Sequence, residues 1–184
     1  MEKGYLSLIL HAHLPFVRHP EYEDFLEERW LFEAISETYI PLLEMFEGLW
    51  KDGVDFSLTL SLSPSLCNML DDQVLKDRYV RYLNKMIELC EKEIDRNKFD
   101  ARFKDLSFMY YDKFSRCKSK FLNEYNRNLI AEFKKYQDRG CLQIITCAAT
   151  HAFLPLLSVN KEAVRAQVRV GINSYRKFFS ADPK

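Results

Sequence analysis

The sequence predicts an α/β fold, because three short strand-like segments are separated by long helical ones. Residues 5–11 and 142–149 are short apolar runs, and residues 56–62 alternate apolar and polar side chains. Helical segments between them favour parallel pairing through right-handed crossovers. With 184 residues, 47% of them hydrophobic, the chain is long enough to be one domain or a large part of one.

The first strand-like segment, YLSLILH at residues 5–11, is almost continuously apolar, as expected of a strand buried on both faces. A segment with helical apolar spacing follows it. Pro41 is expected to break or kink that helix, and Gly53 suits its C-terminal cap. After the second strand-like segment, FSLTLSL, Ser63 is expected to cap a helix that has Pro64 at its first position.

The longest helical part follows, at residues 64–138, and it is expected to divide near residues 96–100. Because it exceeds an ordinary crossover, it is interpreted as a helical insertion on the α/β scaffold. The third strand-like segment, LQIITCAA, precedes an amphipathic helix at residues 162–179. The apolar stripe of this helix is formed by Val164, Val168, Ile172, Tyr175 and Phe179.

Composition excludes several classes of protein. The 27 basic and 27 acidic residues cancel, which gives no electrostatic case for nucleic-acid binding. No segment approaches the length of a membrane span, and no secretory signal is expected. The five cysteines are an odd number without Cys-x-x-Cys spacing, so we expect a reducing cytoplasm and no disulfide framework. No cofactor is expected.

Three of the four histidines follow strand-like segments. His11 and His13 lie at the carboxyl end of the first segment, and Thr150 and His151 at that of the third. In parallel α/β folds, chemistry gathers beyond the carboxyl ends of the strands, so three imidazoles are expected on one rim. An imidazole can donate or accept hydrogen bonds, bind a metal or move a proton. His19, before Pro20, is interpreted as a turn residue.

A metal-dependent hydrolase is one interpretation of this pattern. His-x-His at the end of a first barrel strand is typical of amidohydrolases, with His11 and His13 as ligands and His151 as a third. Such sites also need further His, Lys and Asp ligands from later strands, and only His19 remains among the histidines. We therefore predict from the sequence that no metal is bound.

Three longer segments carry a family resemblance. GYLSLILHAHLPFVRHPEYEDFLEERWLFEAISETYIPLL closely resembles the opening of glycoside hydrolase family 57, in particular its α-1,4-glucan branching enzymes. GCLQIITCAATHAFLPLL is similar to the second signature region of that family, and EAVRAQVRVGINSYRKFF to the helix that follows it. The resemblance covers nearly the whole chain, in order and at fitting distances.

The resemblance implies a fold and an activity. Members of this family carry a (β/α)7 barrel and act on α-glucans with retention of configuration, using two carboxylates. The family's glutamate follows the fourth strand and its aspartate comes considerably later; neither signature is present here, and Asp182 belongs to the segment before that strand. Residues 1–184 are therefore expected to be the amino-terminal part of the barrel without the catalytic pair, and inactive alone.

The resemblance also implies substrate-binding residues. His13 matches the histidine that contacts sugar at the cleavage subsite, with His11 beside it, and Thr150 and His151 fit the active-site rim. Trp30 matches an aromatic residue near the glucan cleft, although a place in the helix core fits its spacing equally well. One departure is Gln143: the family usually reads Gly-x-x-Glu in this region, whereas here Gly140 begins the sequence GCLQ.

Three hypotheses remain open. The first, which we favour, is the amino-terminal part of a branching enzyme of glycogen biosynthesis, with amylase or 4-α-glucanotransferase activity not distinguished. The second is a metal-dependent hydrolase. The third is a non-catalytic module that binds glucan or completes its barrel with a second chain. Expected partners are an α-glucan, the remainder of the barrel, and another copy through an exposed sheet edge; membranes and nucleic acids are not expected.

Overall fold

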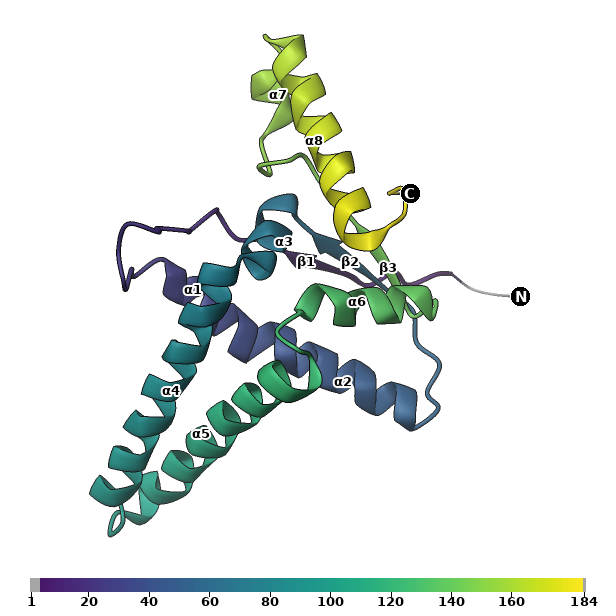
Figure 1. Ribbon diagram of the computed structural model, residues 1–184. Coiled ribbons are helices and arrows are strands. Elements are labelled where there is room, and N and C mark those ends of the chain that lie inside the picture. Colours follow the sequence, from purple (N-terminus) through teal and green to yellow (C-terminus); the bar gives the residue numbers. More distant parts are fainter. Residues whose placement is uncertain (1–3, 184) are drawn as a thin grey trace. The chain divides into compact units, whose positions relative to one another are not determined.

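The computed structural model describes residues 4–183. They contain a parallel three-stranded sheet (Figure 1). The strands are β1 (Ile9–Ala12), β2 (Leu58–Leu62) and β3 (Leu142–Ile145), in the spatial order β1-β2-β3. The α/β class and the parallel pairing are therefore confirmed. β1 and β3 flank β2 and do not neighbour each other.

The chain forms two compact units. The sheet unit contains the described residues up to Arg18, Leu43–Asp71 and those from Ile130 onward. The helical unit contains His19–Leu42 and Asp72–Leu129. Within the described residues, no helix is both long and apolar enough to cross a membrane.

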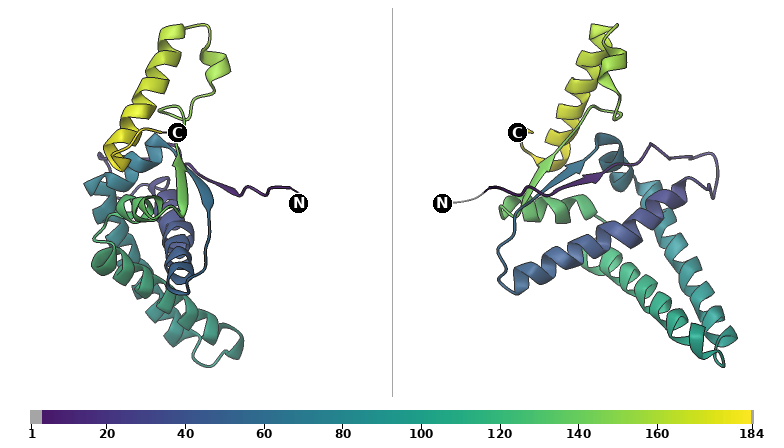
Figure 2. Two further views of the ribbon diagram at one scale, coloured as in Figure 1. Left: turned by 90° about the vertical axis from the view of Figure 1, so that its right-hand side faces the viewer. Right: turned by 180° about the vertical axis from the view of Figure 1, so that it is seen from behind.

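The two faces of the sheet differ in burial. Register pairs Leu10 with Leu60 and Leu60 with Ile144, and Leu60 and Ile144 are 2% exposed. This face is covered by helices, among them α3 (Pro64–Asp71) and α6 (Leu129–Asp138), which lie on the same side of the sheet (Figure 2). Side chains alternate along a strand, so the other face carries Ile9, His11, Thr59, Gln143 and Ile145. Ile9 is 59% exposed, and this face is open.

The prediction of a first strand buried on both faces is wrong. Tyr5 is 93% and Leu6 98% exposed, and β1 begins only at Ile9. Ile9 pairs with Thr59, and β2 starts at Leu58, so residues 5–7 extend past the strand that could pair with them. An apolar run shows the affinity of a segment for burial, but the burial itself depends on partners elsewhere in the chain.

The other two strands are also shorter than predicted. β2 begins at Leu58 and not at residue 56, and β3 ends at Ile145 and not at residue 149. After β3 the chain leaves the sheet, and the Ala149 N–H donates to the carbonyl of Gln167 on a helix, 3.1 Å away. The site residues Thr150 and His151 are therefore on a loop and not directly at the strand end.

Pro41 does not end its helix. α1 (Glu28–Ala34) is followed by a π-helical turn, η1 (Ile35–Tyr39), and then directly by α2 (Ile40–Lys51). Proline has no N–H to donate, and the turn before it is where regular α-helical hydrogen bonding is interrupted. The predicted disturbance is thus a π-helical turn. Gly53 has a φ of 68°, as its predicted role at the helix end requires.

The long helical part has the predicted division. It contains α3, α4 (Gln73–Arg96), α5 (Ala101–Ser119), the π-helical turn η2 (Lys120–Glu124) and α6. Ser63 caps α3, since its Oγ accepts a hydrogen bond from the Leu66 N–H at 3.4 Å. Asp100 caps α5 through the Arg102 N–H at 3.0 Å.

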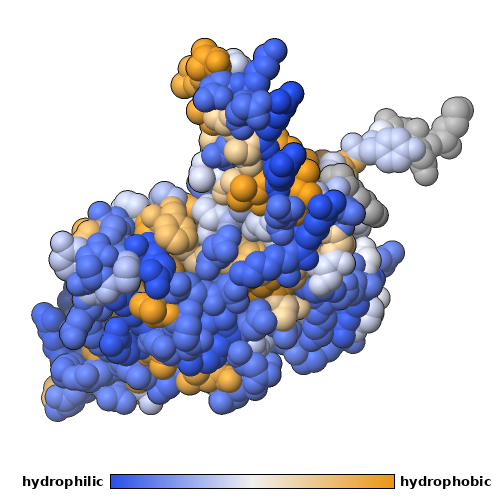
Figure 3. All heavy atoms as spheres, turned by 45° about the horizontal axis from the view of Figure 1, so that its top comes forward, coloured by the Kyte–Doolittle hydropathy of each residue, from blue (hydrophilic) through white to orange (hydrophobic). Residues whose placement is uncertain are grey.

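The helix after the third strand is confirmed as α8 (Lys161–Phe179), but only two of the five residues of its predicted stripe are buried. Tyr175 and Phe179 are 4% and 2% exposed, and the Tyr175 hydroxyl donates to the Ile144 carbonyl at 3.0 Å. Val168, nearer the helix start, is 44% exposed. Figure 3 shows apolar surface on the part of the molecule that holds α7 (Leu154–Leu157) and α8, where Leu156 is 74% exposed.

Candidate functional site

The structure brings together the three histidines that follow the strands. His11 is on β1, His13 lies one residue beyond it, and His151 lies on the loop after β3. Their ring centroids are 6.3 Å apart for His11 and His13, 5.1 Å for His11 and His151, and 4.0 Å for His13 and His151. The Nε2 atoms of His11 and His151 are 3.2 Å apart. We call these three residues the histidine cluster.

Two serines that follow β2 support the cluster. The Oγ of Ser63, a residue that is 0% exposed, lies 2.9 Å from His13 Nδ1. Ser65 Oγ lies 3.5 Å from the same nitrogen and donates to the Leu14 carbonyl at 3.2 Å. Sequence reasoning gave Ser63 only a capping role and overlooked Ser65. Their place at the carboxyl end of the middle strand was the signal that could have identified them.

The protonation of the cluster is biased toward the neutral form at His13. Burial lowers the pKa of His13 below its ordinary value, and the neighbouring His151 and His11 lower it further. A neutral imidazole offers one donor and one acceptor nitrogen, whereas a charged one only donates. Together with the serine hydroxyls, the cluster can therefore both donate to and accept from hydroxyl groups of a ligand.

Thr150 and Gln143 differ in their relation to the cluster. Thr150 directly precedes His151, and its Oγ1 accepts a hydrogen bond from Gln167 Nε2 at 2.9 Å. Gln143 is on β3 opposite Thr59, and therefore on the same open face of the sheet as His11. Through Thr59 it is level with Ile9, two residues before His11, and so about 7 Å nearer the amino ends of the strands. Gln143 is thus on the correct face but outside the cluster.

Trp30 and His19 belong to the helical unit. Trp30 lies on α1, where its side chain is 46% exposed, so its interpretation as a buried core residue is wrong. The His19 N–H donates to Glu28 Oε1 at 3.0 Å, and its ring lies 3.7 Å from that of Phe25 by centroids. These contacts agree with a structural role for His19.

The grouped histidines do not form a metal site in the part of the chain that the structure describes. Among residues 4–183, no set of three or more His, Cys, Asp or Glu side chains is arranged to hold a metal ion. The five cysteines are free thiols. Burial raises the pKa of Cys67 to about 12, so this thiol stays protonated near neutral pH.

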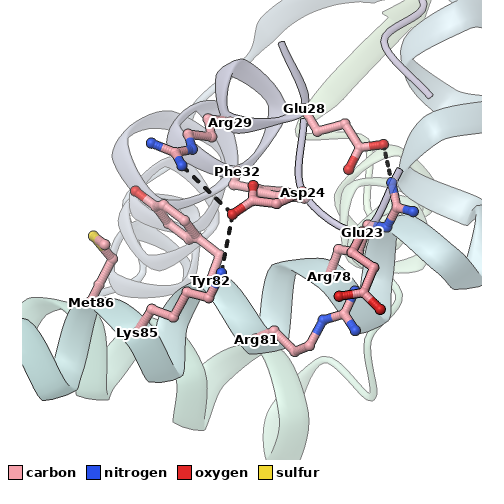
Figure 4. Close-up of a pocket in the computed structure, with 10 residues that line it drawn as sticks. All are labelled: Glu23, Asp24, Glu28, Arg29, Phe32, Arg78, Arg81, Tyr82, Lys85 and Met86. Carbon is pink, nitrogen blue, oxygen red and sulfur yellow. Dashed lines mark hydrogen bonds and ion pairs between the residues drawn. The ribbon is translucent and has the colours of Figure 1, made fainter. Parts of the chain in front are cut away.

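The helical unit contains a charged cavity of about 110 Å³, between residues 23–32 and α4 (Figure 4). Several of its charges are paired. Asp24 forms ion pairs with Lys85 at 3.1 Å and with Arg29 at 3.6 Å. Glu28 pairs with Arg78. The pairs with Lys85 and Arg78 connect residues 24–28 to α4, so we interpret the cavity as a structural ion-pair network.

Comparison with known proteins agrees with the predicted resemblance. Residues 7–184 match the family described as glycosyl hydrolase family 57. The chain is 38% identical over 182 residues to a 1,4-alpha-glucan branching enzyme of Thermococcus kodakarensis, covering 99% of this chain and 26% of that protein. A probable 1,4-alpha-glucan branching enzyme of Mycobacterium tuberculosis is 33% identical over 69 residues, 38% of this chain and 13% of that protein.

Solved structures share the fold. The alpha-amylase AmyC of Thermotoga maritima aligns with a TM-score of 0.93 and 46% identity, covering 99% of this chain and 34% of that one. A GH57-type branching enzyme of Pyrococcus horikoshii aligns with a TM-score of 0.91 and 36% identity, covering 99% and 34%. The chain thus spans about a quarter of the curated Thermococcus relative and about a third of these solved chains. It belongs to glycosyl hydrolase family 57.

Proposed function

We propose that this chain is the amino-terminal part of an α-glucan-active catalytic domain, and that it supplies part of the glucan-binding cleft of a 1,4-α-glucan branching enzyme. The histidine cluster at the carboxyl edge of a parallel sheet carries the proposal, because it gathers hydrogen-bonding side chains where α/β enzymes bind ligands. The relatives named as branching enzymes support the substrate class.

His13 is the proposed central contact to sugar. Ser63 engages its Nδ1, so Nε2 is the ring nitrogen left for a ligand. Neutral His13 suits a sugar hydroxyl, which can be matched as donor or acceptor without a charge being desolvated. His11, Thr150 and His151 are proposed to line the same subsite, with Gln143 contributing further along the open face of the sheet. That Trp30, in the helical unit, contacts glucan stays a prediction from the sequence.

The open face of the sheet supports the incomplete-barrel part of the proposal. In a β/α barrel, helices cover one face of the sheet and the other face lines the interior. Here helices cover the face of Leu60 and Ile144, and the face of His11 and Gln143 is open. We propose that residues 1–184 form the first three β/α units of a (β/α)7 catalytic barrel, with residues 64–138 as a helical insertion between the second and third strands.

The catalytic carboxylates are proposed to lie outside these residues. A retaining glycosidase needs a nucleophile and an acid/base about 5 Å apart. The groups that contact the histidine cluster are imidazoles and serine hydroxyls, which fits a role in binding and not in bond cleavage. Cytoplasmic glycogen synthesis is the proposed context, supported by five free thiols.

Hydrolysis of α-glucan is a second candidate. Its support is the 46% identity to the Thermotoga maritima alpha-amylase, against 36% to the Pyrococcus horikoshii branching enzyme. The two activities differ in the acceptor, a sugar hydroxyl in branching and water in hydrolysis. Binding of glucan by the histidine cluster is common to both.

Binding is tested by titrating the 184-residue polypeptide with maltoheptaose. His13→Ala is expected to weaken binding about tenfold or more, because it removes the proposed hydrogen bond between the imidazole and the sugar. His19→Ala makes the same chemical change in the helical unit and is expected to leave binding unchanged. Equal affinity of the wild type and His13→Ala would contradict the proposed binding site.

The activity is tested with chimeras. Residues 1–184 replace the corresponding segment in the Thermococcus kodakarensis branching enzyme and, separately, in the Thermotoga maritima amylase. Branch points and new reducing ends are then counted on amylose. Efficient branching by the first chimera and poor hydrolysis by the second support the branching proposal; the opposite pattern supports hydrolysis.

A further inference from the structure

His151 has an unusual backbone conformation. Its φ is 55°, in the left-handed region that a side chain with a Cβ rarely adopts. Its N–H donates to the Ala148 carbonyl at 2.8 Å, which closes a tight turn. This conformation is unfavourable for a residue other than glycine, so contacts from outside the turn must stabilise it.

One residue of α8 supplies three of these contacts. The Gln167 carbonyl accepts from the Ala149 N–H at 3.1 Å, and its Oε1 accepts from the Thr150 N–H at 3.0 Å. Its Nε2 donates to Thr150 Oγ1 at 2.9 Å. Gln167 therefore binds both residues that directly precede His151, through its main chain and both ends of its amide.

Gly171, one helical turn further along α8, allows the close approach. It is buried, and a Cβ at this position would lie 2.5 Å from the Cys147 carbonyl oxygen. Main chain cannot yield as the end of a flexible side chain can, so a larger residue would push α8 away from the loop. Gly171 thus sets the distance at which Gln167 reaches Thr150.

We propose that Gln167 is a positioning residue of the glucan-binding site: through Thr150 it holds the His151 ring against His11 and His13. Gly171 is the second part of this device, because it allows α8 to lie on residues 147–150. That this contact serves glucan binding rests on the proposed function. That Gln167 holds the His151 ring in place does not. α8 contributes no residue to the histidine cluster, but through Gln167 and Gly171 it contacts the loop that carries His151.

The direct test is Gln167→Met, which keeps the length of the side chain and removes both amide hydrogen bonds. NMR cross-peaks between the ring protons of His13 and His151 report the contact, whose centroids are 4.0 Å apart. We expect these cross-peaks to weaken or disappear. The titration midpoint of His13 should also rise toward that seen in His151→Ala, because His151 contributes to its lowered pKa. A purely structural role in helix packing would move neither signal.

Three further variants make the test specific. Arg169→Met places the same side chain on an exposed position of α8 and should leave both signals unchanged. Gln167→Glu can accept from the Thr150 N–H and hydroxyl, and should restore the cross-peaks. Thr150→Val removes only the hydroxyl contact and should give an intermediate loss, which keeps the proposal testable if Gln167→Met does not fold.

Maltoheptaose titration separates this inference from the proposed function. We expect Gln167→Met to weaken binding about tenfold, because displacement of the His151 ring would remove about one hydrogen bond to the sugar. If His13→Ala weakens binding but Gln167→Met changes neither binding nor the ring cross-peaks, the positioning role is overturned. If Gln167→Met moves the rings and neither His13→Ala nor His151→Ala affects binding, the positioning role stands and the proposed glucan site fails.

Discussion

His13 is the member of the histidine cluster whose charge the fold controls. It lies between the hydroxyl of Ser63 and the rings of His11 and His151, with 2.9 Å to Ser63 Oγ and 4.0 Å between its ring centroid and that of His151. A charged His13 ring would be partly removed from water and would lie beside the rings of His151 and His11, which disfavours the charged form. His13 can therefore both donate and accept hydrogen bonds near neutral pH, and in acid it loses the acceptor nitrogen.

The first prediction is a loss of stability in acid that depends on His13. The folded state lowers the pKa of His13 below the ordinary value of 6.5, so the unfolded chain binds this proton more tightly. The stability contributed by neutral His13 is complete above pH 6.5 and is lost as the pH falls through the folded-state pKa. Urea unfolding at pH 7.5 and pH 5 should show a smaller drop in His13→Gln than in the wild type. His19→Gln should retain the full drop; identical drops in all three proteins would refute the prediction.

A second prediction at this scale concerns metal. Zinc sites usually combine imidazoles with further His, Cys or carboxylate ligands at fixed geometry, and no such group is present among the described residues. Elemental analysis of the purified protein should therefore find less than one equivalent of zinc, manganese or iron. Tight stoichiometric metal that is lost when His11 and His13 are replaced would favour the amidohydrolase interpretation.

At the scale of elements, the segment before α1 is held to α4 by one buried arginine. Arg78 is 7% exposed and Glu28 1% exposed, and the two form an ion pair. The Arg78 guanidinium also donates to the carbonyls of His19, at 3.0 Å, and Tyr22. Such a pair fixes one arrangement of the chain because either charge alone would be buried without compensation.

Glu28→Ala is accordingly predicted to destabilise the protein by about 3–5 kcal/mol, the usual cost of an unpaired buried charge. Asp24→Ala removes an exposed carboxylate from the same cavity, and its cost should stay below about 1 kcal/mol. The measurement is urea unfolding followed by circular dichroism. Glu28→Ala/Arg78→Met should regain part of the lost stability; a double variant less stable than Glu28→Ala would argue against the charge explanation.

Local chemistry explains which elements the sequence predicts well. The cap at Ser63, the positive φ at Gly53 and the division near residues 96–100 all depend on neighbours within a few residues. The exposure of β1 and of the first half of α8 does not depend on near neighbours. It depends on whether a distant segment of the chain packs against them. An apolar pattern states what a face could bury and carries no information about its partner.

The same division applies to the site. His11, His13 and His151 could be predicted because they follow strand-like runs, and a general rule places such residues at one edge. The contact of His13 with Ser63 spans 50 positions in sequence, and the contacts of Thr150 with Gln167 depend on the angle at which α8 crosses the loop. Neither has a signature in residue spacing. The contact between His13 and Ser63 follows from the register in which β1 pairs with β2.

At the scale of the whole chain, the first prediction is the absence of turnover. Removing a catalytic nucleophile or acid/base lowers rates by several orders of magnitude, and both carboxylates of the family are expected outside these residues. The 184-residue polypeptide should therefore neither branch nor hydrolyse amylose, as measured by iodine staining and by new reducing ends. Activity that persists after repurification and in His13→Ala would contradict this expectation.

Self-association is the last prediction, and it follows from the edges of the sheet. Within residues 4–183, β1 and β3 each pair with one strand only, so each presents an outer edge. Leu8 and Ile9, on and beside β1, are 55% and 59% exposed, and an apolar open edge can pair with another copy. Light scattering of the 184-residue polypeptide should show a dimer or a higher assembly, or the protein should be poorly soluble.

Two variants test whether the edge of β1 is responsible. Ile9→Lys places a charge on that strand and should shift the mass toward the monomer. Val159→Lys, at a position 93% exposed and away from the strands, should not. A stable monomer at high concentration would show that the exposed edge does not drive association. Equal shifts in both variants would assign the effect to net charge and not to the edge of β1.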